Sequence, residues 1–310
     1  MSGGEPSALP TLETVRDRAR ELAATVPTGR SVNVLAVPVD GSDPLAGVER
    51  IDDRYVGERA AQAGLLAAAV EAVAETADAR LHWPDPDFTA DGPWIVLSPL
   101  GGRLATVTRG TARVTVEIDR ERAGAHRSLA IDDERLSTIL DAARPDHGHY
   151  PVEDDDVGVF TTGMTTFSLS SVDTDGETLT VVLDAETTPA TTASEIEGRF
   201  ADLDGVRVVR VDPTTGADRG ALDADLRSAV ERAHVETLGD AEYVWLPPGS
   251  PLAHVPGGDK VALGTGTPDE AFTQELYDEC VTLLSRSLAG VARSLADGRE
   301  ERADAAGRSA

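Results

Sequence analysis

The hydrophobic pattern of the chain changes character twice, and these two changes constrain its fold more than any other feature. Up to about residue 103, apolar runs such as 32–39 alternate with helical patterns such as 60–73, which is typical of strands covered by helices. Between about 104 and 212 the strands alternate apolar and polar residues with period two. The first pattern then returns. We therefore predict a small α+β domain inserted into a larger α/β domain.

The predicted boundaries follow these changes of pattern. The α/β domain, with a mixed sheet and covering helices, comprises residues 10–103 and 213–297. The inserted α+β domain comprises residues 104–212. Residues 1–9 and 298–310 are small and polar, and we expect them to form flexible tails.

Two local signals lie inside the predicted insert. The strands 104–108 and 111–118 flank Arg109-Gly110, and we predict that they form a hairpin. Thr192 is followed three residues later by Glu195, the pattern of a capping box at the start of a helix.

The charge of the chain excludes one class of partner. Asp and Glu number 55 against 28 Lys and Arg, which gives a net charge of −27, and Lys260 is the only lysine. Because the acidic residues are spread along the chain, we predict a strongly hydrated surface adapted to high salt. Nucleic-acid binding needs clustered basic residues, which the sequence lacks. We therefore expect no nucleic-acid partner.

The sequence also suggests where the protein works. The single cysteine, Cys280, excludes an internal disulfide, and it lies in a strongly helical stretch where packing is its expected role. The first ten residues lack the basic flank and apolar core of a signal peptide. Apolar runs are too short and too interrupted by Glu to span a membrane. We expect a cytoplasmic protein without a membrane partner.

Four short segments occur in an order that carries a family resemblance. The first surrounds Gln62-Ala-Gly64, the second runs from Trp94 through Ser98-Pro99 to Arg109-Gly110, the third is Gly124-Ala-His126-Arg-Ser128, and the fourth is 261–270, with Gly266-Thr-Pro-Asp-Glu. Together with the inserted domain, they resemble the M20 zinc peptidases and amidohydrolases, which include aminoacylases, deacetylases and desuccinylases. The resemblance implies an M20-like catalytic-type domain with an inserted lid or dimerisation domain. It also implies a homodimer, or a heterodimer with an active paralogue.

The same resemblance implies a dinuclear zinc site, which needs about five His or carboxylate ligands. At four positions that match family ligands, this chain has Pro38, Gln62, Ser98 and Gly266. Pro38 and Gly266 offer no ligand atom, and the neutral groups of Gln62 and Ser98 are poor zinc ligands. Asp40 and Asp87 remain as relic metal positions, with Asp40 also a candidate catalytic residue.

Other candidate residues lie outside this set. His126 matches a lid histidine that reaches the partner's active site in dimeric family members, and it is the second candidate catalytic residue. In the family's "D-x-R" motif an Arg binds the substrate carboxylate, but Asp184-Ala-Glu186 places an acid there, which we expect to repel such a substrate. A replacement metal site could combine His82, Asp85 and Asp87 with Asp40 and His254. His147 and His149 could bind a metal or belong to a solvated loop.

Two functional hypotheses follow. The first is an M20-like protein that has lost its metal site and acts as a non-catalytic homologue or partner subunit, with no cofactor. The second is an active amidohydrolase that cleaves N-acyl amino acids or dipeptides with a rearranged metal set, in which case the cofactor would be zinc or cobalt.

Overall fold

The computed structural model describes residues 8–25, 31–36, 42–84, 87–119, 125–144, 165–174, 178–189, 191–215, 218–219, 224–255 and 259–307. The chain divides into two compact units. The large unit comprises Met1–Thr106, Gly220–Val244 and His254–Ala310, and the small unit comprises Val107–Arg219 and Trp245–Ala253. A mixed α/β fold, as predicted, is confirmed.

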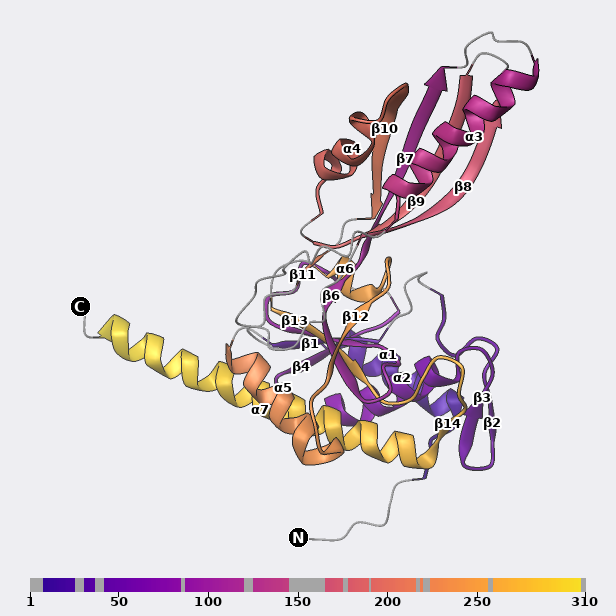
Figure 1. Cartoon of the computed structure of the whole chain (residues 1–310). Helices are drawn as coiled ribbons and strands as arrows, with labels where there is room; N and C mark the ends of the chain where they lie inside the picture. Colours follow the sequence, from indigo (N-terminus) through magenta and orange to yellow (C-terminus); the bar gives the residue numbers. More distant parts are fainter. Residues whose placement is uncertain are drawn as a thin grey trace. The chain divides into compact units, whose positions relative to one another are not determined.

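The large unit is built on a mixed sheet with covering helices (Figure 1). Its elements in chain order are α1 Leu12–Ala24, β1 Val32–Leu35, β2 Glu49–Ile51, β3 Arg54–Val56, α2 Ala60–Ala74, β4 Ala79–His82, β5 Trp94–Leu97, β6 Arg103–Thr108, α5 Ala224–Leu238, β12 Tyr243–Leu246, β13 Lys260–Gly264, β14 Phe272–Thr273 and α7 Gln274–Gly307. The strands β2, β3 and β14 form a separate small antiparallel sheet.

The central sheet of the large unit has the strand order β6-β13-β5-β1-β4. The strands β13, β5, β1 and β4 are parallel to one another, and β6 runs antiparallel to β13. All four residues of β1 and of β5 are buried, because parallel strands are covered on both faces. The carboxyl ends of the four parallel strands therefore meet at one edge of the sheet.

The helix α2 lies at the centre of the helical packing. It contacts the strands β4 and β5 and the helices α1 and α7, and nearly every one of its residues is buried. Its alanines and Gly64 allow this close approach on all sides. Along α7, Tyr277, Cys280 and Leu284 face the core, and Cys280 has no exposed surface. The predicted packing role of Cys280 is consistent with this position, and burial raises the pKa of its thiol to about 11.

The small unit is a two-layer α+β structure (Figure 1). Its elements in chain order are β7 Gly110–Asp119, α3 Ala125–Ala142, β8 Thr166–Thr174, β9 Thr178–Thr187, α4 Ala193–Ala201, β10 Val206–Thr215, β11 Asp218–Arg219 and α6 Pro251–His254, of which the last residue belongs to the large unit. The antiparallel sheet has the order β10-β7-β9-β8, which leaves β8 at one edge.

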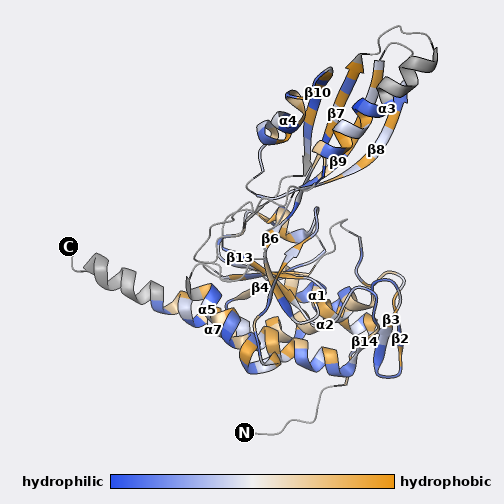
Figure 2. Cartoon of the chain, viewed as in Figure 1, coloured by the Kyte–Doolittle hydropathy of each residue, from blue (hydrophilic) through white to orange (hydrophobic). Residues whose placement is uncertain are grey.

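The core of the small unit follows the predicted period of two. Alternate residues of β7 and β9, such as Val114, Val116 and Val181, are buried against α3 and α4, and Figure 2 shows the matching hydropathy alternation. The predicted capping box is confirmed, since Thr192 accepts a hydrogen bond from the Glu195 backbone and the Glu195 carboxylate accepts one from the Thr192 backbone.

Three predictions about local structure were wrong. The strands 104–108 and 111–118 do not form a hairpin, because β6 pairs with β13 and β7 pairs with β9 and β10. Leu9 does not belong to a flexible tail; it is 1% exposed, and its backbone N–H donates to the Gln274 side chain. The helix α7 continues to Gly307, well past residue 297. Within the described ranges, no helix is both long and apolar enough to cross a membrane.

Candidate functional site

The residues that the resemblance assigns to metal binding follow the carboxyl ends of the parallel strands. Ser98 comes directly after β5, Gly266 comes two residues after β13, and Asp87 comes five residues after β4. Because these strands are parallel, all three residues belong to the same edge of the central sheet. Pro38 and Asp40, which follow β1, lie outside the described residues, as does Asp85.

Ser98 and the segment around Gly266 are brought directly together. The Ser98 backbone N–H donates to the Leu263 carbonyl at 3.0 Å, and the Gly101 N–H donates to the Gly266 carbonyl at 2.8 Å. A Cβ at Gly264 would lie 2.3 Å from the Ser98 carbonyl oxygen, so only glycine fits there. Two of the four replaced ligand positions therefore share one small region of the large unit.

Gly266 has a backbone that disfavours a metal-binding side chain. Its φ is +71°, a left-handed conformation that L-residues rarely adopt. A Cβ at this position would lie 3.3 Å from the buried Phe272 ring and 3.5 Å from Leu276. A histidine here would need both an unfavourable backbone and movement of Phe272. The ligand side chain is therefore absent at this position, and the backbone conformation and the neighbouring residues also disfavour one.

Gln62 lies in the first turn of α2. Its Oε1 atom is buried, and no hydrogen-bond donor among the described residues reaches it. The Phe272 ring packs directly on the α-carbon of Gly64, one half-turn further along the helix, and it also faces Gly266. Phe272 therefore links the α2 segment of the resemblance to the Gly266 segment. We did not predict a role for Phe272, because a single aromatic residue before a helix gives no signal in the sequence.

Asp87, the second relic position, uses its carboxylate for contacts within the protein. The carboxylate accepts hydrogen bonds from the Thr89 hydroxyl at 2.6 Å and the Thr89 backbone at 3.1 Å, and it pairs with Arg80 at 3.3 Å. The Thr89 hydrogen bonds, followed by the charge of Arg80, lower the pKa of Asp87. This carboxylate is therefore already satisfied by protein groups.

His82 is equally committed to protein contacts. Its Nδ1 accepts a hydrogen bond from the Asp87 backbone at 3.2 Å, so its Nε2–H donates to Asn33 Oδ1 at 2.9 Å. The ring lies against Trp94 with centroids 4.5 Å apart and is 2% exposed. Burial, with the charge of Arg80, lowers the pKa of His82 to about 4. Neither ring nitrogen has a lone pair left for a metal.

The proposed replacement metal site gains no support from the described residues. His254, its other histidine, is exposed at the end of α6. Among the residues that the structure describes, no group of three His, Cys, Asp or Glu side chains could hold a metal ion. The amide of Gln62, the hydroxyl of Ser98 and the bare Gly266 do not fit a zinc pair, which requires charged and imidazole ligands. Asp40 and Asp85 are outside these ranges.

In the small unit, the two acids at the family's substrate-carboxylate position are neutralised by arginines. Asp184 forms a two-pronged ion pair with Arg113, with contacts of 2.8 and 3.3 Å. Glu186 pairs with Arg109 at 2.9 Å, and the Arg109 guanidinium lies over the Trp245 ring. Each acid therefore has a cationic partner, and the expected repulsion of a carboxylate substrate stays a prediction.

The remaining histidines can be placed only in part. His126 lies in the first turn of α3, and its side chain is outside the described part of the chain. His147 and His149 are also outside the described residues. A role for His126 stays a prediction.

Comparisons with known proteins bear on the fold. No family model matches the sequence, and no curated protein matches it. Among solved structures, the chain is similar to the M20 family metallo-carboxypeptidase Sso-CP2 from Sulfolobus solfataricus, with a TM-score of 0.51, 11% identity, and 90% of this chain and 93% of the other covered. It is also similar to the YXEP protein of Bacillus subtilis, a dinuclear metal-binding peptidase of the M20 family, with a TM-score of 0.52, 11% identity, and coverage of 91% and 92%.

These two similarities extend over nearly the full length of all the chains compared. At 11% identity they report the fold and leave the chemistry open. The chain therefore has the fold of the M20 family metallopeptidases.

Proposed function

We propose that this chain is a non-catalytic protein with the M20 fold, acting in the cytoplasm as a homologue or partner subunit of an active amide-bond hydrolase. The observation that carries the proposal is Gly266. Where the resemblance requires a histidine ligand, the backbone has a φ of +71° and the Phe272 ring lies 3.3 Å from any added Cβ. A chain under selection to hold zinc would not pair a left-handed glycine with a bulky neighbour at a ligand position.

The other replaced positions support the same proposal. Among the described residues no donor reaches the buried Gln62 oxygen, whereas a metal-bridging carboxylate would be neutralised by the cations that it binds. Asp87 and His82, two candidate ligands in the described ranges, use their acceptor atoms in contacts within the protein: Asp87 with Thr89 and Arg80, and His82 with the Asp87 backbone.

Metal analysis tests this proposal directly. The purified protein, incubated in molar KCl with zinc, cobalt or manganese and then desalted, should retain much less than one ion per chain by inductively coupled plasma mass spectrometry. It should also leave N-acyl amino acids and dipeptides uncleaved. One or two tightly bound ions per chain, or cleavage of either substrate class, would overturn the proposal and favour an active amidohydrolase with a rearranged metal set.

We also propose that the small unit mediates dimerisation, either with a second copy or with an active paralogue to which it would contribute His126. The support comes from β8, the edge strand of the sheet. Leu169 pairs with the buried Leu183 and so lies on the core side of the sheet, yet it is 48% exposed. Val172 on the same side is 39% exposed. Among the described strands β8 has a neighbour on one side only, and a sheet edge with exposed apolar residues favours strand-to-strand association.

Sedimentation in molar KCl tests the association surface. The substitution Leu169→Glu should convert a dimer to a monomer, because it places a charge in the interface. Val235→Glu is the matched control, since Val235 is 53% exposed on α5 of the large unit and should leave the dimer intact. A wild-type protein that sediments as a monomer, alone and with a co-expressed paralogue, would contradict the proposal.

A further inference from the structure

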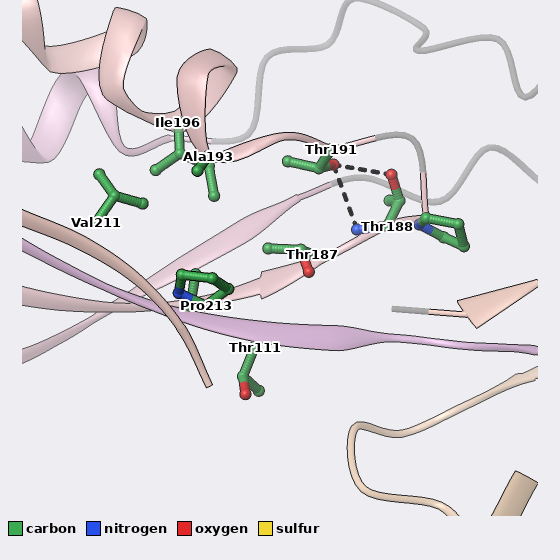
Figure 3. Close-up of a pocket in the computed structure, with 10 residues that line it drawn as sticks. Thr111, Thr187, Thr188, Thr191, Ala193, Ile196, Val211 and Pro213 are labelled. Atoms are coloured by element: carbon green, nitrogen blue, oxygen red, sulfur yellow. Dashed lines mark hydrogen bonds between the residues drawn. The ribbon is translucent and has the colours of Figure 1, made fainter. Parts of the chain in front are cut away.

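A pocket in the small unit differs in chemistry from the edge of the central sheet. It has a volume of about 210 Å³ and lies where α4 begins beside the ends of β7, β9 and β10 (Figure 3). Its lining consists of four threonines, two prolines and four small or aliphatic residues: Thr111, Ala112, Thr187, Thr188, Pro189, Thr191, Ala193, Ile196, Val211 and Pro213. None of these side chains can ionise.

Two hydroxyls that line the pocket, those of Thr188 and Thr191, belong to a connected group whose third member, Thr165, is not a lining residue. The Thr191 hydroxyl is hydrogen-bonded to the Thr188 hydroxyl at 2.8 Å and to the Thr165 hydroxyl at 2.7 Å, and it accepts the Thr188 backbone N–H at 3.3 Å. Figure 3 shows Thr191 and Thr188 side by side at the pocket wall. Thr188 is 3% exposed and Thr165 is 4% exposed, so this wall is held in place by the fold.

The three threonine hydroxyls together carry one proton more than the hydrogen bonds among them use. Three hydroxyls carry three protons, and two oxygen-to-oxygen bonds use two of them. Thr191 donates to one neighbour and accepts from the other, so one end of the chain, at Thr188 or Thr165, has a proton for an acceptor outside the group. Because hydroxyl protons rotate, the direction of the chain can adapt to a molecule in the pocket.

The opposite wall is apolar. Ala112 and Ile196 belong to the hydrophobic core of the small unit, and Val211 packs against that core. A bound molecule would therefore meet carbon on one side and hydroxyl groups on the other. A charged molecule would have no counter-charge among the lining residues and would lose its hydration, which is costly.

We propose that this pocket binds a small uncharged polyol. A polyol has a carbon skeleton for the Ile196 side and hydroxyls that both donate and accept, which suits either direction of the threonine chain. The volume of about 210 Å³ is sufficient for a molecule the size of glycerol or erythritol. The site is independent of metal binding in the large unit.

Methyl NMR of the whole protein in molar KCl tests the proposal, with erythritol as the probe. The Thr188 and Ile196 methyl signals should shift and saturate, with a dissociation constant on the order of 10 mM given the small size of the ligand. Lactate at the same concentrations should give no saturable shift, because it is charged. Shifts that stay linear in erythritol, or equal saturation by lactate, would overturn the proposal.

Two substitutions connect the binding to this pocket. Thr188→Val keeps the shape and removes the hydroxyl, so erythritol should bind about tenfold more weakly. Ala193→Leu fills the pocket from an exposed position that tolerates a larger residue, and it should abolish binding even if Thr188→Val does not fold. Thr180→Val, on the opposite face of β9, is the control and should bind as the wild type does. Unchanged binding in the Ala193→Leu protein would refute the site.

Discussion

At the scale of single residues, buried polar side chains are fixed by partners far apart in the sequence. His82 is held by Asn33 on a neighbouring strand and by the Asp87 backbone, in one tautomer, with its pKa lowered to about 4. Gln62 shows the opposite situation, with a buried oxygen that no described residue satisfies. Neither state could be predicted from the sequence, because residue type alone does not specify which groups the fold brings within hydrogen-bond distance.

His82 makes the stability of the protein depend on pH in a predictable direction. Its folded pKa of about 4 lies below its unfolded value of 6.5, so the unfolded state binds the proton first as the pH falls. The stabilisation is complete above pH 6.5 and is lost between 6.5 and 4, by up to about 3 kcal/mol. Urea unfolding at pH 7 and pH 4.5 should show a smaller acid loss for His82→Gln than for wild type.

The exposed His254 supplies the control for this experiment. His254→Gln should reproduce the wild-type acid loss, since the other titrating groups, including the buried His234, are unchanged in both variants. An acid loss of the same size in wild type and in His82→Gln would contradict the role given to His82.

Gly266 and Gly47 form a matched pair that isolates the effect of Phe272. Both have a φ of +71°, but a Cβ at Gly47 would meet no atom of the described residues within 4 Å, whereas one at Gly266 would lie 3.3 Å from Phe272. Each change to Ala should cost about 1 kcal/mol for the left-handed backbone. Gly266→Ala should cost about 1 kcal/mol more, measured by urea unfolding, because the Phe272 ring must move.

A double-mutant cycle checks the origin of this excess cost. In a Phe272→Leu background, the difference between Gly266→Ala and Gly47→Ala should shrink, since the ring that opposes the new Cβ is gone. An unchanged difference would mean that a neighbour other than Phe272, such as Leu276, opposes the new Cβ, and it would weaken the argument that Phe272 prevents a restored ligand.

At the scale of the elements, sequence patterns predicted well where helices and strands lie. They predicted less well which strands pair with each other. Thr192 and Glu195 marked the start of α4 correctly, because a capping box is a local interaction. The hairpin across Arg109-Gly110 was wrong, because two adjacent strands give the same period-two signal whether they pair with each other or with distant strands. Strand partners are chosen by the whole core, which no short window contains.

Two helical glycines should respond in opposite ways to the same substitution. Gly64 in α2 lies against the Phe272 ring, where a Cβ would be 2.0 Å from the nearest ring atom, so Gly64→Ala should destabilise the protein by more than about 2 kcal/mol. A Cβ at Gly198 in α4 would meet no described atom within 4 Å, so Gly198→Ala should stabilise the protein by about 0.5–1 kcal/mol. Thermal unfolding shows whether each substitution raises or lowers the stability of the protein. A loss of stability in both variants would show that backbone effects dominate over the space around the new Cβ.

At the scale of the whole molecule, the acidic excess gives the chain a net charge of −27 that no local contact balances. The described ion pairs, such as Arg16–Asp43 and Arg113–Asp184, neutralise only some of these acids. The residual repulsion acts across the surface and is screened by salt, whose Debye length falls from about 10 Å at 0.1 M to about 3 Å at 1 M. The composition predicted this property directly, because net charge does not depend on the fold.

Stability should therefore rise steeply with salt. We expect the urea midpoint to increase between 0.1 M and 3 M KCl, as screening removes repulsion among carboxylates. A variant with three exposed acids neutralised, Glu21→Gln, Glu75→Gln and Glu197→Gln, should be more stable than wild type at 0.1 M and should gain less from added salt. An equal gain in both proteins would assign the salt effect to apolar burial and not to charge.

The reactivity of the buried Cys280 thiol can be used to measure how often the large unit opens. Cys280 is the only cysteine, has no exposed surface, and has a thiol whose pKa is raised to about 11. A thiol reagent can therefore react only in the moments when α7 separates from the core. At reagent concentrations where the unit closes faster than the thiol reacts, the rate of reaction of Cys280 divided by the rate of a free thiol equals the fraction of time that the large unit is open. One natural atom thus reports the rare open state without a label or a substitution.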